Sequence, residues 1–215
     1  MFIPALIMYS MLYDITRTLN ASTAVFPGDT PVSITQVARM SAGASCNVSA
    51  ITLSAHAGTH IDAPKHYSDV GIGIDQVTPD VFLGPARVLS LDVARTITQA
   101  DLQKHDLAHV QRLLLHTRGS ATPNNIFDTS FVHFDEAAAN YLGSLGLKLI
   151  GVDNPSVDEA TSKTLPAHMA FLRHNVIILE NLCLTGVPDG NYELIALPIK
   201  IENCDAAPAR VFLRS

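Results

Sequence analysis

The sequence predicts a mixed α/β fold in a single domain. Its first half contains short alternating or continuous apolar stretches, which are typical of strands. Its second half alternates strand-like with helix-like segments. No repeat, low-complexity segment or linker-like change in composition divides the 215 residues, a length that suits one domain with a full core.

The first half is expected to be dominated by strands. A turn cluster, Phe-Pro-Gly-Asp-Thr-Pro at residues 26–31, precedes the first alternating stretch. Later stretches are continuously apolar, as buried strands are. We expect strands over residues 31–37, 48–54, 86–93 and 110–116, and a short helix over 98–104.

The second half is expected to contribute the main helices. Residues 135–142 are rich in alanine, and Pro166 suits the first turn of a helix over 165–173. Strands are expected over 147–152 and 176–180. Because no Gly-x-Gly-x-x-Gly or Walker-type loop follows any strand, these are not nucleotide-binding units.

Composition narrows the classes of partner. Hydrophobic residues make up 47% of the chain and charged residues 16%, so most of it should lie in a core or an interface. The net charge is −6, and Lys and Arg form no cluster, which argues against nucleic acid or an anionic membrane as a partner. We expect a small molecule or another protein chain instead.

The N-terminal segment, the absence of long apolar stretches and the cysteines indicate where in the cell the protein is found. Residues 1–11 are an apolar leader of unassigned role, without the cationic start of a signal peptide, and the domain is expected over 12–215. No stretch approaches the roughly 20 apolar residues of a membrane span. The three cysteines are odd in number and widely spaced, so we expect buried thiols in a reducing cytoplasm.

The most informative segment is His-Ala-Gly-Thr-His-Ile-Asp-Ala-Pro-Lys-His, residues 56–66. Gly58 and Pro64 break any helix and supply bends, which are needed because an extended chain would separate its ends by roughly 33 Å. Imidazole nitrogens and carboxylate oxygens are the ligands that zinc prefers. We therefore expect a metal site, with candidate ligands His56, His60, Asp62 and His66.

Two later residues are weaker candidates by themselves. His168 is expected in the first turn of a helix, and Glu180 at the end of the strand that follows. His168 could equally cover a helix surface, and Glu180 could be a solvated strand end. Asp153 and Asp158 flank a Pro-Ser turn and are expected to be structural caps.

Residues 56–66 match in full the signature His-x-Gly-Thr-His-x-Asp-x-Pro-x-His of the metal-dependent cyclase/formamidase superfamily. Further segments resemble its bacterial kynurenine formamidase branch, so that the resemblance extends over about residues 12–213. These segments are residues 26–31, 151–158, 162–168 and 191–200. The resemblance implies a barrel-like mixed β core flanked by helices, and a homodimer.

The resemblance also implies a centre of two divalent ions, zinc first and manganese as the alternative. One ion would be held by His56, Asp62 and His168, and the other by His60, Asp62 and Glu180, with Asp62 shared. Three protein ligands per ion leave open positions for water and substrate. His66 is then the general acid/base, a role that suits imidazole.

The implied activity is hydrolysis of N-formyl-L-kynurenine, an aryl formamide, to L-kynurenine and formate. Phe26 and Asp29 would line the substrate pocket. The chain has Phe26 where the branch typically has Trp, and Met169 where it often has a second His. These departures keep one alternative open, the same metal chemistry on another amide or an isatin-like ring. A second alternative is a non-enzymatic protein in which the histidine loop binds a structural metal.

Overall fold

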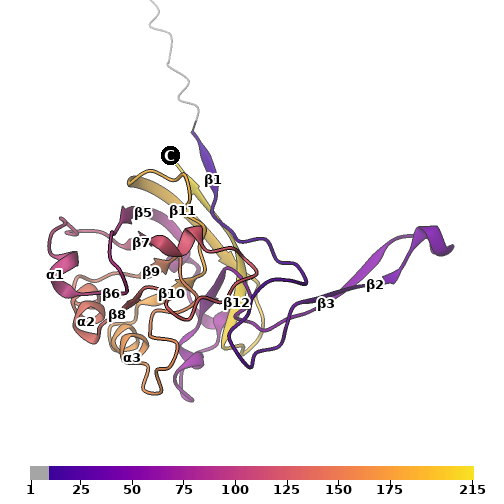
Figure 1. The fold of residues 1–215 in the computed structure, drawn as a ribbon, viewed down its shortest axis with the longest axis horizontal. Helices are drawn as coiled ribbons and strands as arrows, with labels where there is room; N and C mark the ends of the chain where they lie inside the picture. Colours follow the sequence, from indigo (N-terminus) through magenta and orange to yellow (C-terminus); the bar gives the residue numbers. More distant parts are fainter. Residues whose placement is uncertain (1–9) are drawn as a thin grey trace, which may run out of the picture.

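Seven strands close into a mixed β-barrel in the computed structural model, which describes residues 10–215 (Figure 1). Around the barrel the order is β12, β11, β5, β7, β9, β10 and β4, with β4 pairing back to β12. β1 (Leu12–Asp14) adds to the edge of β12. The barrel strands are β4 (His60–Asp62), β5 (Leu83–Ser90), β7 (Arg112–His116), β9 (Leu149–Val152), β10 (Ile177–Glu180), β11 (Gly190–Pro198) and β12 (Ala206–Arg214).

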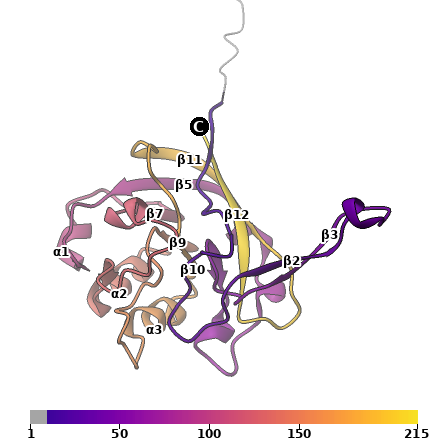
Figure 2. The same cartoon turned by 45° about the vertical axis from the view of Figure 1, so that its right-hand side comes forward.

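The barrel has a parallel and an antiparallel half. β5, β7, β9 and β10 run parallel, and three helices cover their outer face (Figure 2). The helices are α1 (Gln99–Leu102), α2 (Glu136–Ser144) and α3 (Pro166–Arg173). Strand alternation divides the core: Leu114 points into the barrel, while Leu113 and Leu115 pack beneath the helices.

The expected fold class, a single α/β domain with a barrel-like mixed core flanked by helices, is confirmed. Each expected strand and helix overlaps an observed one. Local chemistry explains the helix starts, since Thr98 and Asp101 form a capping box and Asp135 caps α2. The long antiparallel pair β11 and β12 was not predicted from strand patterns.

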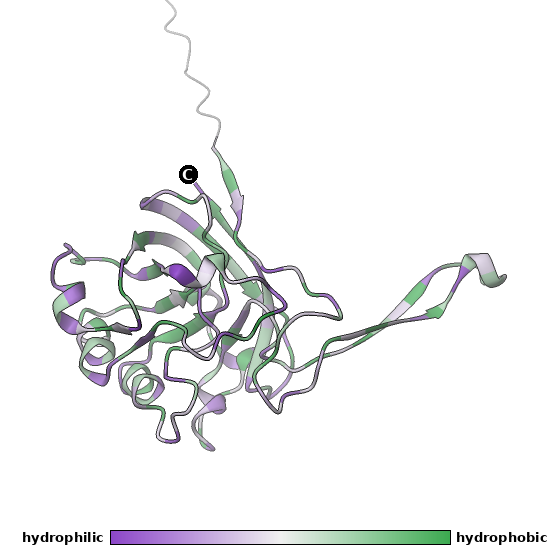
Figure 3. Cartoon of the chain, viewed as in Figure 1, coloured by the Kyte–Doolittle hydropathy of each residue, from purple (hydrophilic) through white to green (hydrophobic). Residues whose placement is uncertain are grey.

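A two-stranded arm projects from the barrel (Figures 1 and 3). It consists of β2 (Ser33–Ala38) and β3 (Val48–Thr52), joined through a 3₁₀ turn at Met40–Ala42. Nearly every residue of both strands is exposed. The expected strand leading to the histidine loop is therefore present, but it lies outside the core.

Shorter features complete the fold. β6 (Thr96–Ile97) and β8 (His133–Phe134) form a small parallel pair. All three cysteines are free, but the expectation that they are buried was wrong: Cys46 is exposed in the arm, and Cys183 and Cys204 are partly exposed. Within residues 10–215 no helix is long and apolar enough to cross a membrane.

The first described residues lie beside the C-terminus. Met11 and Ser215 exchange hydrogen bonds, which continues the pairing of β1 with β12 by one residue. The leader expected over residues 1–11 otherwise lies outside the described residues.

Candidate active site

Two neighbouring strands place three of the candidate ligands on the outer face of the barrel. In β4, Ile61 points into the barrel core, so His60 and Asp62 point to the opposite side. In β10, Leu179 points inward and Glu180 outward. The antiparallel register pairs Glu180 directly with His60, which brings the three side chains together.

The loop around β4 bends as the sequence predicted. Gly58 has a φ of 66°, and a Cβ there would also collide with Leu19. Pro64 starts a 3₁₀ turn that ends at His66. The ring centroids of His56 and His66 are consequently only 4.1 Å apart, although ten positions separate the residues.

The N-terminus of α3 supplies His168 from the other side. Asp158 accepts hydrogen bonds from the backbone N–H groups of Ala167 and His168. The same carboxylate lies 2.6 Å from His168 Nδ1. Asp158 is therefore the expected cap, and in addition it orients the imidazole so that Nε2 faces the other candidate ligands.

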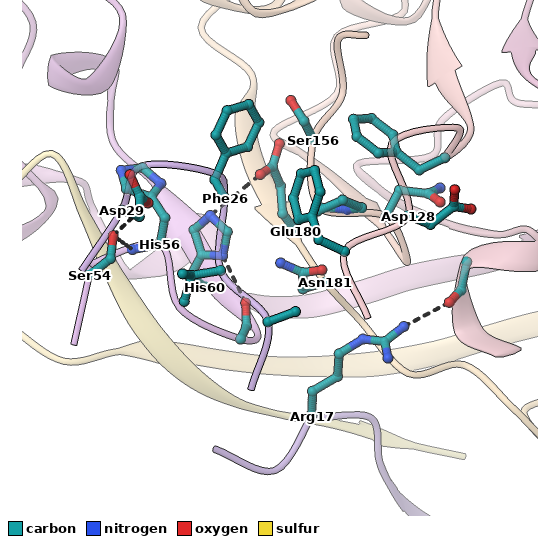
Figure 4. A pocket seen from close by; sticks show the side chains of 18 of the residues that line it. Arg17, Phe26, Asp29, Ser54, His56, His60, Asp128, Ser156, Glu180 and Asn181 are labelled. Atoms are coloured by element: carbon teal, nitrogen blue, oxygen red, sulfur yellow. Dashed lines mark hydrogen bonds and ion pairs between the residues drawn. The ribbon is translucent and has the colours of Figure 1, made fainter. Parts of the chain in front are cut away.

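The candidate ligands meet around Asp62, and three of them, His56, His60 and Glu180, are seen in the pocket in Figure 4. His56 Nδ1 lies 3.0 Å and His60 Nε2 lies 3.3 Å from Asp62 Oδ1, whereas His168 Nε2 lies 3.6 Å from Oδ2. Glu180 closes the cluster, 3.4 Å from His60 Nε2 and 3.8 Å from His168 Nε2. All five predicted ligands are thus neighbours.

Buried polar atoms at the centre of this cluster fit a cation. Both oxygens of Asp62 and Nε2 of His60 are buried without a hydrogen-bond partner among the described residues. A carboxylate removed from water is costly unless it is paired or coordinates a metal. The donors are imidazole and carboxylate, so the residues present fit a divalent ion of the zinc type.

The donor atoms form two overlapping groups. His60, Asp62 and Glu180 lie within 4.8 Å of one another, as expected for the second ion. The other group is His56, Asp62 and His66, rather than His56, Asp62 and His168. His66, and not His168, thus shares a group with His56 and Asp62, and the expected assignment of His168 to the first ion remains a prediction.

The carboxylates also govern the charge of the buried imidazoles. Burial disfavours the charged form of His60, but Asp62 and Glu180 outweigh it and raise its pKa to about 10. Burial likewise opposes the charge on His168, while Asp158 and Asp62 raise its pKa to about 10. Burial works against ionisation of Asp62, yet the three imidazoles hold its pKa well below the usual range.

His66 differs from the other histidines of the cluster. It lines the cavity, and 32% of its side chain is exposed. Burial and the neighbouring imidazoles lower its pKa, partly offset by Asp62 and Glu180. A neutral imidazole at the edge of the cluster is suited to accept and return a proton.

A cavity of about 530 Å³ opens above the cluster, a volume typical of small-molecule sites. Phe26 and Asp29, the two expected substrate-binding residues, both line it. Asp29 accepts a hydrogen bond from Ser54 (Figure 4). Phe26 meets Phe127 edge to face at 5.2 Å, and Phe127 meets Phe131 at 6.2 Å.

Sequence reasoning missed Phe127 and Phe131. They lie in a loop near residue 130, far in sequence from Phe26, and no local pattern marks that loop as part of the pocket. The three rings form an aromatic wall (Phe26, Phe127 and Phe131) in the cavity that the candidate ligands also line. Such a wall suits a planar aryl group.

Comparison with known proteins identifies the family. The profile of the family described as Putative cyclase matches residues 13–159. The chain is 41% identical over 209 residues to a curated kynurenine formamidase of Delftia acidovorans, covering 97% of this chain and 99% of that protein.

Solved structures share the fold. A predicted metal-dependent hydrolase from Bacillus stearothermophilus superposes with a TM-score of 0.84 at 29% identity, covering 95% of this chain and 98% of that one. Isatin hydrolase A from Labrenzia aggregata superposes with a TM-score of 0.81 at 21% identity, covering 95% and 93%. The chain belongs to the cyclase family and, within the metal-dependent cyclase/formamidase superfamily, to the bacterial kynurenine formamidase branch.

Proposed function

We propose that this protein is a metal-dependent arylformamidase that hydrolyses N-formyl-L-kynurenine to L-kynurenine and formate. The observation that carries the proposal is the buried Asp62, whose two oxygens have no hydrogen-bond partner among residues 10–215 and lie beside imidazoles that line an aromatic-walled cavity. Likeness to the Delftia acidovorans kynurenine formamidase over nearly the whole of both chains supports the choice of substrate.

We propose two divalent ions in this centre, zinc or, as the alternative, manganese. His56, Asp62 and His168 would hold one ion, and His60, Asp62 and Glu180 the other. When bound, such ions polarise a carbonyl group and lower the pKa of water from about 15.7 towards 7. The close approach of the other four side chains to Asp62 supports this assignment.

The chain's own residues would then position the reactants. The aromatic wall would hold the aryl ring, so that the formyl group reaches down to the ligand cluster. His66 Nδ1 or Nε2 would take a proton from the attacking water and return one to the departing aryl amine. The C–N bond breaks, the water oxygen remains on the formyl carbon, and the products are formate and the amine.

A second candidate is hydrolysis of an isatin-like cyclic amide. Phe26 stands where the branch typically has a larger Trp, so the aromatic wall differs from the branch pattern at this position. The same proton transfer by His66 would open such a ring without releasing formate. Because isatin hydrolases have the same fold, the fold does not distinguish the two substrates, and we expect the aromatic wall to do so.

We also propose that the protein works as a homodimer built through the arm. An isolated two-stranded hairpin is marginally stable in water, yet this one exposes apolar side chains and carries Arg39 as its one charged residue over 33–52. The exposed apolar residues are Ile34, Val37, Met40, Val48 and Ile51. Light scattering should give twice the chain mass, and Ile51→Lys should shift it towards the monomer, whereas a monomeric parent would refute the dimer.

The proposed activity is tested by steady-state hydrolysis of N-formyl-L-kynurenine, with isatin as the competing substrate. We expect zinc- or manganese-loaded protein to release one formate per kynurenine, and chelated protein to lose the activity. Turnover of isatin without turnover of the formamide would select the second candidate. Metal-loaded protein that is inactive on both would overturn the hydrolase proposal for these substrates.

A further inference from the structure

Asp205 lies beside the ligand cluster although it comes from the far end of the chain, immediately before β12. Its Oδ2 is 3.0 Å from His56 Nε2, in hydrogen-bond geometry. The same oxygen lies 3.7 Å from His66 Nδ1, which is too long for a hydrogen bond. Asp205 therefore contacts chiefly Nε2 of His56. We call this the outer nitrogen of the ring, and Nδ1, which faces Asp62, the inner nitrogen.

The inner nitrogen of His56 is placed differently. His56 Nδ1 lies 3.0 Å from Asp62 Oδ1, yet that oxygen has no hydrogen-bond partner among residues 10–215. A neutral imidazole carries one proton, and the contact with Asp205 places it on Nε2. The lone pairs of Nδ1 and of Asp62 then face the same point, an arrangement that a cation between them stabilises.

The other two imidazoles are held in the same way. His60 Nδ1 lies 2.9 Å from the carbonyl oxygen of Gly58, and His168 Nδ1 lies 2.6 Å from Asp158. In each ring, the outer nitrogen meets an acceptor and the inner nitrogen faces Asp62. His56 completes the pattern through Asp205.

We propose that Asp205 is a positioning residue, whose carboxylate accepts the Nε2 proton of His56 and thereby presents Nδ1 to the first ion. The inference rests on the metal centre of the proposed function, not on the substrate. Acceptors behind metal-bound imidazoles fix both the tautomer and the ring orientation.

The backbone around Asp205 supports this role. Its carbonyl oxygen accepts the N–H of Ala63 at 2.8 Å, and the next residue, Ala206, pairs with Asp62 itself. The preceding connector is tied down as well, since Cys204 accepts from Ile74 and Asn203 donates to Asp75. The carboxylate is therefore fixed relative to the ligand strand β4, as a positioning residue requires.

The test is zinc affinity, measured on metal-free protein by competition with a chromophoric chelator. We expect Asp205→Ala to weaken one of the two zinc equivalents by about 10–100-fold and to spare the other. Asp205→Asn should lose less, because its amide oxygen still accepts the imidazole proton. Glu202→Ala is the matched control: Glu202 is an exposed acid of the same connector and should bind zinc as the parent does.

Three outcomes would overturn the proposal. Asp205→Ala could bind both zinc equivalents as tightly as the parent, or Glu202→Ala could weaken binding equally. Alternatively, Asp205→Ala could raise only KM at unchanged zinc affinity, which would make this partly exposed carboxylate a contact for a cationic group of the substrate. A parent that binds zinc but leaves the formamide intact would refute the substrate and leave this inference standing.

Discussion

The cavity has two walls, a ligand wall formed by the candidate metal ligands and the aromatic wall, and they differ in how firmly the fold holds their side chains. The ligand wall consists of buried side chains on β4, β10 and α3, held in place by strand register and by Asp158, and of the partly buried His56 in the loop before β4. The aromatic wall consists of Phe26, which is exposed, and of a loop that carries the half-buried Phe127 and the buried Phe131. We therefore expect the strands and α3 to determine the metal chemistry, and the aromatic wall, whose residues can change without disturbing the core, to determine the choice of substrate.

The largest effect should come from substituting Asp62, the ligand that both proposed ions share. Asp62→Ala removes the one carboxylate next to all three imidazoles, so we expect both ions to be lost and kcat/KM to fall at least about 1,000-fold. Metal analysis alongside kinetics checks this. A variant that retained both ions would show that Asp62 does not bridge them.

The second-largest effect should come from substituting His66. This substitution distinguishes the two roles that the geometry allows for His66, general acid/base and ligand of the first ion. We expect His66→Ala to lower kcat by about 100–10,000-fold while metal content stays at the parent level. His168→Ala is the control and should lose an ion. If His66→Ala lost an ion and His168→Ala did not, His66 would be a ligand of the first ion.

A pH effect should distinguish the metal-free from the metal-loaded ligand wall. The raised pKa values of His60 and His168, about 10, mean that their stabilising charge is complete below the unfolded pKa of about 6.5 and is lost as pH rises towards 10. The Tm of chelated protein should therefore fall from pH 7 to 10, whereas zinc affinity should rise, because bound imidazoles must lose a proton. A flat Tm and a flat affinity over this range would contradict the account.

The smallest effect should come from the aromatic wall. Phe127→Ala removes the ring that bridges Phe26 and Phe131, so we expect KM for N-formyl-L-kynurenine to rise about 10-fold with metal content and kcat little changed. Ile199→Ala, an exposed apolar residue away from the cavity, is the control. An equal effect on an alkyl formamide would show that the wall does not select aryl groups.

The same division explains what the sequence could predict. The histidine loop was predictable because four candidate groups and their bends lie within residues 56–66. His168 and Glu180 were weak by themselves and were identified through family resemblance, because α3 and β10 join them to the loop only in three dimensions. Asp158 was expected to cap a turn, and its second role required the position of the imidazole.

Features formed by long-range contacts escaped prediction. Asp205 reaches His56 across 149 positions, because β12 pairs with β4 to close the barrel. The arm was predicted as strands, but no pattern in its residues told an exposed ribbon from a core sheet. Phe127 lies in a loop whose sequence shows no periodicity, so its place in the aromatic wall could not be predicted.

The central claim is that five side chains hold two ions through one shared carboxylate, and zinc stoichiometry tests it most directly. Metal-free protein should bind two zinc ions per chain in a calorimetric titration, with Asp62→Ala binding neither tightly. Saturation at one zinc per chain, or two tight zinc ions retained by Asp62→Ala, would contradict the account.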